Sequence, residues 1–285
     1  MPIEAAELRA CEELARQLAQ YAVTEMDGRR VHAEERSTKD GLSDWVTVVD
    51  VGIERHVRQE VHAAFPRHSI VGEEFGRSGN FTEGTPVWYV DPVDGTTNFV
   101  HGLPWSSFSL AVADDEGLAL GVVADPHRGE LFSAVRGHGA LINREPATCT
   151  SAGDLVGGLV LSELAGTACW PGFTEMLYEL SSRGCVTRVM GSSALSLASV
   201  GAGRAGGVVL GGFDPIDVGA GVLIARESGA VVRAGSAASP VLRAGGDPAE
   251  DTLGHDLLVA AAPGLVDELV EIVELAMAAG NAAPP

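Results

Sequence analysis

Two aspartates three positions apart lie in the most distinctive segment of this 285-residue sequence. Asp91 and Asp94 follow a short apolar run and are separated by a Pro-Val pair, and Gly95 and Thr96 come directly after them. Carboxylates at this spacing can converge on one hard cation, and the backbone between them offers a carbonyl oxygen as a further ligand. Gly95 permits a tight turn, after which backbone amides can face an anion if a helix starts there. An ordinary Asp-Pro, Asp-Gly turn also explains these residues.

Other acidic residues fall at predicted strand ends and helix starts. Glu73 follows a predicted strand over 69–72, and Asp50 and Asp217 lie in the first turns of two predicted helices. Taken singly, each is explained as a solvated strand end or as a carboxylate near a helix N-terminus. Together they recur where α/β folds build their sites, and a site with several acids needs divalent cations. Oxygen ligands without His or Cys favour Mg²⁺, Mn²⁺ or Ca²⁺ over Zn²⁺.

Four segments of the sequence resemble the inositol monophosphatase family of magnesium-dependent, lithium-sensitive phosphatases. Residues 91–104 (DPVDGTTNFVHGLP) are similar to the family signature, 72–74 to its first metal motif, 46–50 to its upstream aspartate motif and 214–221 to its C-terminal motif. Their order and spacing agree over almost the whole chain, so chance is a poor explanation. The resemblance implies an α+β fold, a layered αβαβα sandwich similar to the inositol monophosphatase and fructose-1,6-bisphosphatase fold.

The resemblance also implies a set of metal ligands. These are Glu73, Asp91, Asp94, Asp217 and the backbone carbonyl of Val93. Asp91 would be shared between a first and a second Mg²⁺, and Glu73 would help to bind a third. Two to three Mg²⁺ per active site are implied, with Mn²⁺ as a substitute and Li⁺ or Ca²⁺ as inhibitors. Such ions activate water, clamp a phosphate and stabilise the leaving alkoxide, so that in-line attack needs no phospho-enzyme.

Catalytic and substrate-binding residues are implied in the same way. Asp50 and Thr96 would orient and deprotonate a metal-bound water, and Glu73 would assist through the third ion. The implied substrate contacts are Asp94, Gly95, Thr96, Gly191, Ser192 and Asp217. Ser192 also fits a plain helix N-cap. Lys39, the only lysine, falls at the family's loop-lysine position, so we expect it at the pocket mouth as a loop gate.

Two positions depart from the family pattern. Ile216 stands where a tryptophan often precedes the last metal aspartate, and Leu210 replaces a glutamate that binds a substrate hydroxyl in inositol-handling members. The sequence predicts a Mg²⁺-dependent phosphatase of a small polyol or sugar phosphate monoester similar to inositol 1-phosphate. Histidinol phosphate, fructose 1,6-bisphosphate and a 3′-phosphonucleotide are alternative substrates for the same chemistry. A catalytically weak binding or regulatory subunit is an alternative of a different class.

Hydrophobic periodicity predicts the elements that must position these residues. Apolar residues three and four apart predict helices over 3–26 and 47–65. Alternating and continuous apolar runs separated by turn residues predict an antiparallel meander over 106–137. A G-x-G-x-x-G pattern at 201–206 lies between a predicted helix and a predicted strand. That order is the reverse of a dinucleotide fingerprint, so we interpret it as a helix end and a turn.

The chain is expected to be one catalytic unit, 1–285, made of two halves. A Pro-, Ser- and Gly-containing stretch at 146–154 separates them. The half 1–148 is α+β and carries the main metal motifs. The half 149–285 alternates strands and helices, which is typical of a largely wound α/β layer, and carries the last metal aspartate.

Composition excludes several classes of protein. The 39 Asp and Glu residues against 19 Lys and Arg give a formal net charge of −20. Such a chain has no global basic field for a nucleic acid and is repelled by an anionic membrane. The partner that the resemblance implies is a small phosphorylated metabolite. Without an N-terminal signal pattern or an apolar span, a cytoplasmic location with reduced cysteines is expected. The resemblance suggests a homodimer, and the apolar meander at 106–135 is either interface or core.

Overall fold

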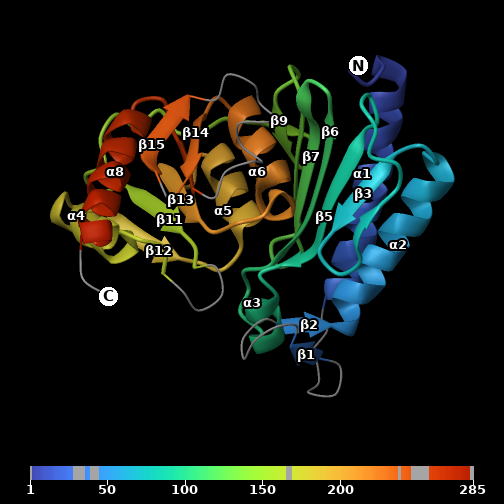
Figure 1. Ribbon diagram of the computed structural model, residues 1–285, viewed down its shortest axis with the longest axis horizontal. Coiled ribbons are helices and arrows are strands. Elements are labelled where there is room, and N and C mark those ends of the chain that lie inside the picture. The colour runs from blue at the N-terminus through green and yellow to red at the C-terminus, as the bar shows by residue number, and fades with distance from the viewer. Residues whose placement is uncertain are drawn as a thin grey trace.

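The computed structural model describes residues 2–27, 36–38, 45–164, 169–236, 239–244 and 257–282. The elements stack in layers in the order α-β-α-β-α (Figure 1). Helices α1 and α2 cover one sheet, α5 and α6 fill the space between this sheet and a second one, and α4 and α8 cover the far face of the second sheet. The predicted layered sandwich is therefore confirmed.

The helices match the predicted periodicity closely. They are α1 (Ala5–Met26), α2 (Val48–Ala64), α3 (Thr96–His101), α4 (Phe173–Ser182), α5 (Ser193–Gly201), α6 (Pro215–Glu227) and α8 (Val266–Ala282). The apolar stripe of α2 is buried from Val49 to Val61 but ends there, because Ala64 is exposed. Residues 194–201 of α5 and 218–225 of α6 are buried on every side, as expected for helices between two sheets.

The first sheet contains the predicted meander. Its strands are β3 (Ser69–Gly72), β4 (Gly76–Ser78), β5 (Val87–Asp94), β6 (Ser107–Asp114), β7 (Gly117–Asp125), β8 (Glu130–Val135), β9 (Ala140–Ile142) and β10 (Glu145–Ala147). The spatial order is β10-β9-β8-β7-β6-β5-β3-β4, with only β3 and β5 parallel. Nearly all of β6 and β7 is buried within the chain, so of the two interpretations of 106–135 the structure supports core.

The second sheet is less regularly wound than predicted. Its strands are β11 (Leu159–Ser162), β12 (Val186–Val189), β13 (Gly207–Gly211), β14 (Val231–Ser236), β15 (Ser239–Ala244) and β16 (Leu257–Ala261). Strand β11 is parallel to β12 and β13, but β16 runs antiparallel to β13 and β14, and β14 pairs with β15 in a hairpin. The pattern at 201–206 is the end of α5 and the turn into β13, as interpreted.

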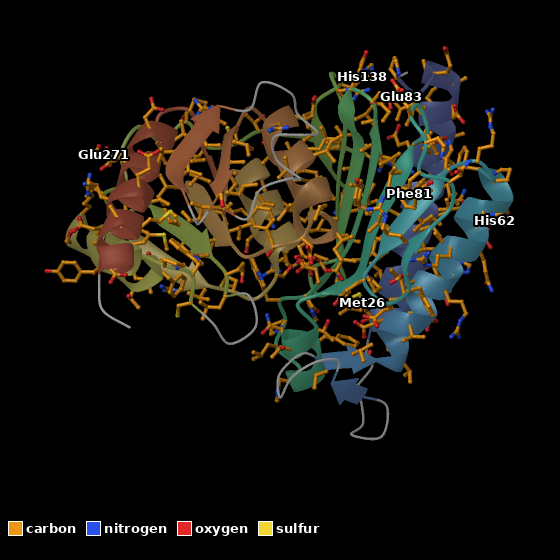
Figure 2. All side chains as sticks on the ribbon, in the orientation of Figure 1. Met26, His62, Phe81, Glu83, His138 and Glu271 are labelled. Carbon is orange, nitrogen blue, oxygen red and sulfur yellow. The ribbon has the colours of Figure 1, made fainter. Side chains whose placement is uncertain are left out.

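Polar side chains cover the outer helical layers. His62 on α2 and Glu271 on α8 are exposed and point away from the sheets (Figure 2). Among the described residues, no helix is long and apolar enough to cross a membrane. The short strands β1 (Arg36–Thr38) and β2 (Trp45–Thr47) pair antiparallel directly before α2.

The first sheet and α6 approach each other so closely that one strand residue has room only for hydrogen. A Cβ atom on Gly121 of β7 would lie 2.7 Å from the carbonyl oxygen of Ala220. We expect Gly121→Ala to destabilise the protein by about 1–3 kcal/mol through overpacking and to lower its Tm by several degrees. Thermal unfolding followed by circular dichroism measures this.

A matched control lies in α2. A Cβ on Gly52 meets nothing within 4 Å, so Gly52→Ala should stabilise the helix by about 0.5–1 kcal/mol. If the two variants melted at the same temperature, the close contact between β7 and α6 would carry no energetic weight.

Candidate active site

A cavity of about 590 Å³ lies where the two sheets and their helices meet. Its walls come from the β3–β4 turn, the end of β5 with the start of α3, the end of β11, the turn before α5, and the end of β13 with the start of α6. Among the residues predicted for the site, those that line the cavity are Glu73, Asp94, Gly95, Thr96, Gly191 and Asp217. Those that lie behind its wall, almost completely buried, are Asp50, Asp91, Val93 and Ser192. The structure therefore brings these residues into one region.

Lys39 and His101 do not take part in the described cavity wall. Lys39, the expected loop gate, lies outside the described residues. His101 is exposed at the end of α3 and does not line the cavity.

Strand β5 carries both aspartates of the central motif through an irregular stretch of sheet. Its register with β6 shifts between Asp91 and Asp94, and the Val93 N–H donates to Asp91 Oδ1 over 3.0 Å. Gly95 then takes the left-handed φ of 87°, and α3 begins at Thr96. The turn interpretation of this motif is wrong in detail, because a bulge in a continuous strand replaces the turn. As a result, both carboxylates leave the same strand end.

Asp50 links the start of α2 to the start of α3. The Thr47 N–H donates to Asp50 Oδ2 over 2.9 Å, and the Thr47 hydroxyl also contacts that oxygen. The Thr96 hydroxyl lies 3.3 Å from Asp50 Oδ1 and 2.8 Å from the Val93 carbonyl. Burial raises the pKa of Asp50 to about 6, although the hydrogen bonds from Thr47 oppose this rise. Asp50 is thus both a first-turn carboxylate of α2 and a partner of Thr96.

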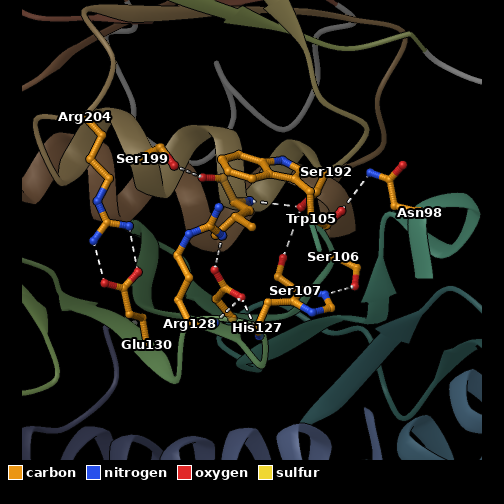
Figure 3. Close-up of polar contacts among 12 residues, drawn as sticks. Asn98, Trp105, Ser106, Ser107, His127, Arg128, Glu130, Ser192, Ser199 and Arg204 are labelled. Atoms are coloured by element: carbon orange, nitrogen blue, oxygen red, sulfur yellow. Dashed lines mark hydrogen bonds and ion pairs between the residues drawn. The ribbon is translucent and has the colours of Figure 1, made fainter. Parts of the chain in front are cut away.

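The N-terminus of α5 holds Asp94. Ser192 Oγ donates to Asp94 Oδ2 over 2.5 Å, and the backbone amides of Ser193 and Ala194 donate to its two oxygens over 3.1 and 2.8 Å. Ser107 of β6 lies 3.2 Å from Ser192 (Figure 3). Burial raises the pKa of Asp94 to about 6 against these hydrogen bonds. Ser192 is also the N-cap of α5, since its hydroxyl accepts the Leu195 N–H.

The acids crowd one another at the base of the cavity. Burial, followed by the charges of Glu73, Asp94 and Asp217, raises the pKa of Asp91 well above its usual range. Burial, with further contributions from Asp94 and Glu73, raises the pKa of Asp217 to about 8. Acids that repel one another in this way gain from a bound divalent cation, and an all-oxygen donor set fits Mg²⁺ or Mn²⁺. Within the described residues, no group of three or more Asp, Glu, His or Cys side chains already forms a complete set of metal ligands, although these carboxylates lie in one region.

Glu163 belongs to the cavity although no sequence motif pointed to it. It follows β11 and is 6% exposed. One of its carboxylate oxygens accepts the Gly191 N–H, and the other accepts the Ser196 hydroxyl over 2.6 Å. Burial raises its pKa to about 8. Because Ser162 pairs with Val209 across the parallel strands β11 and β13, Glu163 lies beside Leu210, which also lines the cavity. The one feature of the sequence that could have pointed to this role is the position of the glutamate directly after the short apolar run 159–162.

Asn98 connects the two halves across the site. Its Nδ2 donates to the Trp105 carbonyl over 2.8 Å and to the Met190 carbonyl over 2.7 Å. Trp105 precedes β6, and Met190 lies between β12 and α5. The residue was part of the quoted signature, but its bridging role required the tertiary structure.

Comparison with known proteins gives the family. The chain matches the inositol monophosphatase family over residues 4–275. It is 36% identical over 241 residues to the Nus factor SuhB of Pasteurella multocida, covering 84% of this chain and 86% of that protein. It is 37% identical over 196 residues to the fructose-1,6-bisphosphatase/inositol-1-monophosphatase of Thermotoga maritima, covering 68% of this chain and 73% of that protein.

Solved structures agree with this assignment. SuhB of Mycobacterium tuberculosis shares 32% identity with a TM-score of 0.74, covering 96% of this chain and 98% of that one. The IMPase of Thermotoga maritima shares 28% identity with a TM-score of 0.79, covering 95% and 98%. The chain therefore belongs to the inositol monophosphatase family, which confirms the resemblance found in the sequence.

The buried Glu163 should leave a signature in the pH dependence of stability. Its pKa is raised from 4.5 to about 8 on folding, so its contribution is fully present below about pH 4.5 and is lost as the pH rises through about 8. In chelator-treated protein, we expect the Tm of Glu163→Gln to fall less than that of the wild type between these values, by a few degrees over the window.

Thermal melts at half-unit pH intervals measure this effect. Glu145→Gln, at an exposed position of β10, is the control and should follow the wild-type curve. Parallel curves for Glu163→Gln and wild type would show that Glu163 has no raised pKa.

Proposed function

We propose that this protein is a Mg²⁺-dependent phosphatase that hydrolyses a small polyol or sugar phosphate monoester. The observation that carries the proposal is the convergence of several repelling carboxylates on a cavity that adjoins the Asp50–Thr96 pair. Membership of a family of phosphatases that is generally Mg²⁺-dependent supports it. We keep the view that 1–148 and 149–285 are halves of one catalytic unit, since both contribute to the cavity.

The ligands proposed for two to three Mg²⁺ are Glu73, Asp91, Asp94, Asp217 and the Val93 carbonyl. Bound Mg²⁺ would supply positive charge for the phosphate and Lewis acidity for the attacking water and the leaving alkoxide. Asp91, shared between ions in this scheme, has its pKa raised by burial and by the charges of Glu73, Asp94 and Asp217.

The proposed general base is Asp50. Thr47 fixes one of its carboxylate oxygens, which leaves the other directed at Thr96. With the Thr96 hydroxyl hydrogen directed at Asp50 Oδ1, 3.3 Å away, Thr96 Oγ1 can accept a hydrogen bond from the attacking water. The proton of that water would then move to Thr96 Oγ1 as the Thr96 proton moves to Asp50, and the pair orients the water toward phosphorus.

The phosphate is proposed to lie at the first turn of α3. Gly95 and Thr96 line the cavity there, and their amides are the proposed donors to the phosphate oxygens. Gly191 faces the same cavity and is a proposed contact for the alcohol. Ser192 is 1% exposed and bonded to Asp94, so we propose that it acts on the substrate through Asp94.

The part of the cavity wall that would face the alcohol group of the substrate favours substrates with a single phosphate. Leu164, Leu210, Phe213 and Ile216 provide apolar surface, and no Lys, Arg or His is present among the described lining residues. A second phosphate would therefore lack a cationic partner within the described part of the chain. This favours inositol 1-phosphate-like monoesters or histidinol phosphate over fructose 1,6-bisphosphate and 3′-phosphonucleotides.

A substrate panel tests that preference. With saturating Mg²⁺, we expect kcat/KM for single-phosphate esters to exceed that for fructose 1,6-bisphosphate by about 10-fold or more, the equivalent of one unpaired charge contact. The measurement is phosphate release from a panel of esters, namely inositol phosphates, histidinol phosphate, a 3′-phosphonucleotide and the bisphosphate. If fructose 1,6-bisphosphate had the highest kcat/KM in the panel, this would contradict the inference from the cavity wall.

Asp94→Asn tests the metal-ligand role. Loss of a charged ligand should lower kcat/KM by about 10²-fold or more, while circular dichroism and the melting curve show a folded protein. Asp267→Asn, at an exposed site in the first turn of α8, is the control. Wild-type turnover in Asp94→Asn would remove Asp94 from the proposed ligand set.

A binding role is the second candidate function, because the Pasteurella relative is named a Nus factor. The intact acid set supports the enzyme instead. If no ester in the panel released phosphate while bound Mg²⁺ was confirmed, the binding role would be preferred. We also propose a homodimer, to be checked by light scattering on the eluting protein.

A further inference from the structure

Glu54 of α2 is a buried acid outside the predicted ligand set. It lies one helical turn after Asp50 on the same face of the helix and is 0% exposed. Its carboxylate accepts the backbone N–H of Glu74 over 2.6 Å and that of Phe75 over 3.1 Å. Both amides belong to the connection between β3 and β4 that directly follows Glu73. Glu54 therefore binds the backbone on the C-terminal side of a proposed metal ligand.

The same carboxylate also presses against the backbone on the N-terminal side of Glu73. A Cβ atom on Gly72 would lie 2.2 Å from Glu54 Oε1. Only glycine leaves room for the carboxylate at this position. Glu54 thus contacts the chain immediately before and immediately after Glu73.

Arg58 completes this arrangement one further turn along α2. Its Nε donates to Glu54 Oε1 over 2.8 Å, and its two other nitrogens donate to the Ser78 hydroxyl over 2.6 Å and the Gly76 carbonyl over 2.5 Å. A buried carboxylate is tolerated when charged and backbone donors surround it in this way. Two side chains of α2 therefore span the β3–β4 connection from Gly72 to Ser78.

The connection needs such a constraint because of charge. Glu73 lines the cavity together with Asp94 and Asp217, so like charges face one another there. The tip of the connection is open to solvent, since Phe75 is 46% exposed. Holding the backbone of this turn therefore fixes where the Glu73 carboxylate can lie relative to the aspartates.

We propose that Glu54 is a positioning residue that holds the Gly72–Phe75 backbone so that Glu73 faces the acid cluster before a cation arrives. This rests on the proposed function, in which Glu73 is a Mg²⁺ ligand. Helix α2 then serves the site twice, placing Asp50 with its first turn and Glu73 with its second. Preorganised ligands bind a metal more tightly than ligands that must be gathered, and changing an outer-shell partner costs about 10–100-fold in metal affinity.

The test compares Glu54→Gln with wild type in the full chain, using MgCl₂ as the probe. The amide nitrogen of glutamine would face the N–H donors of Glu74 or Phe75, so one of these hydrogen bonds is lost. We expect the Mg²⁺ concentration that half-maximally raises the Tm to increase about 10–100-fold. Hydrogen exchange at Glu74 and Phe75 should speed up in the chelator-treated variant, and the Mg²⁺ activation constant should rise more than kcat falls.

Glu60→Gln, on the exposed face of the same helix, is the matched control and should behave as wild type in all three measurements. Glu54→Asp, which withdraws the carboxylate by one methylene, supplies an intermediate effect should Glu54→Gln fail to fold. Wild-type Mg²⁺ dependence in a folded Glu54 variant overturns the positioning role, whether or not its amides exchange faster. Absence of any Mg²⁺-dependent Tm rise in wild type overturns the proposed metal site itself, so the two failures are distinguishable.

Discussion

The burial of several carboxylates in one region is the constraint on which the rest of this structure depends. The pKa values of Asp50, Asp91, Asp94 and Asp217 are all raised, with burial as the largest cause in each case. The fold offsets part of this cost with helix N-termini. Asp50 lies in the first turn of α2, Asp217 in that of α6, and Asp94 receives the free amides of α5. Backbone dipoles at these ends stabilise negative charge without placing a competing cation in the site.

The layered architecture follows from bringing these helix ends to one point. Helices α5 and α6 lie between the sheets, so their N-termini reach the end of β5 from the second half of the chain. Asn98 joins the two halves at the same place, since its Nδ2 donates to the Met190 carbonyl of the second half as well as to the Trp105 carbonyl of the first. Close backbone contact is also needed, since a Cβ on Gly95 would lie 2.6 Å from the Gly191 carbonyl. Direct contact between the two halves therefore builds this part of the cavity wall.

Periodicity predicted most of this fold because burial is decided locally along a helix or strand. The buried positions of α2 and the meander are examples, and the helix predicted to have Asp217 in its first turn is observed as Pro215–Glu227. The bulge in β5 was missed because Asp-Pro and Asp-Gly pairs have the same local chemistry in a turn and in a bulge, and pairing with β6 decides between them. Glu54 and Glu163 escaped prediction as site residues for a related reason. Their partners are Glu74 N–H, Phe75 N–H, Gly191 N–H and the Ser196 hydroxyl, all distant in sequence.

The division of the cavity into two chemical sides explains how a chain of net charge −20 can be reconciled with a phosphate substrate. On one side the acids have a common need for divalent cations, and those cations would reverse the local sign of the potential. On the other side, the described walls are apolar or acidic, with Leu210 and Glu163 adjacent on neighbouring strands. Affinity for phosphate would then arise from the metal side. In the proposed function, discrimination between alcohols would fall to the opposite wall, where Leu210 stands in place of the glutamate that the resemblance leads one to expect.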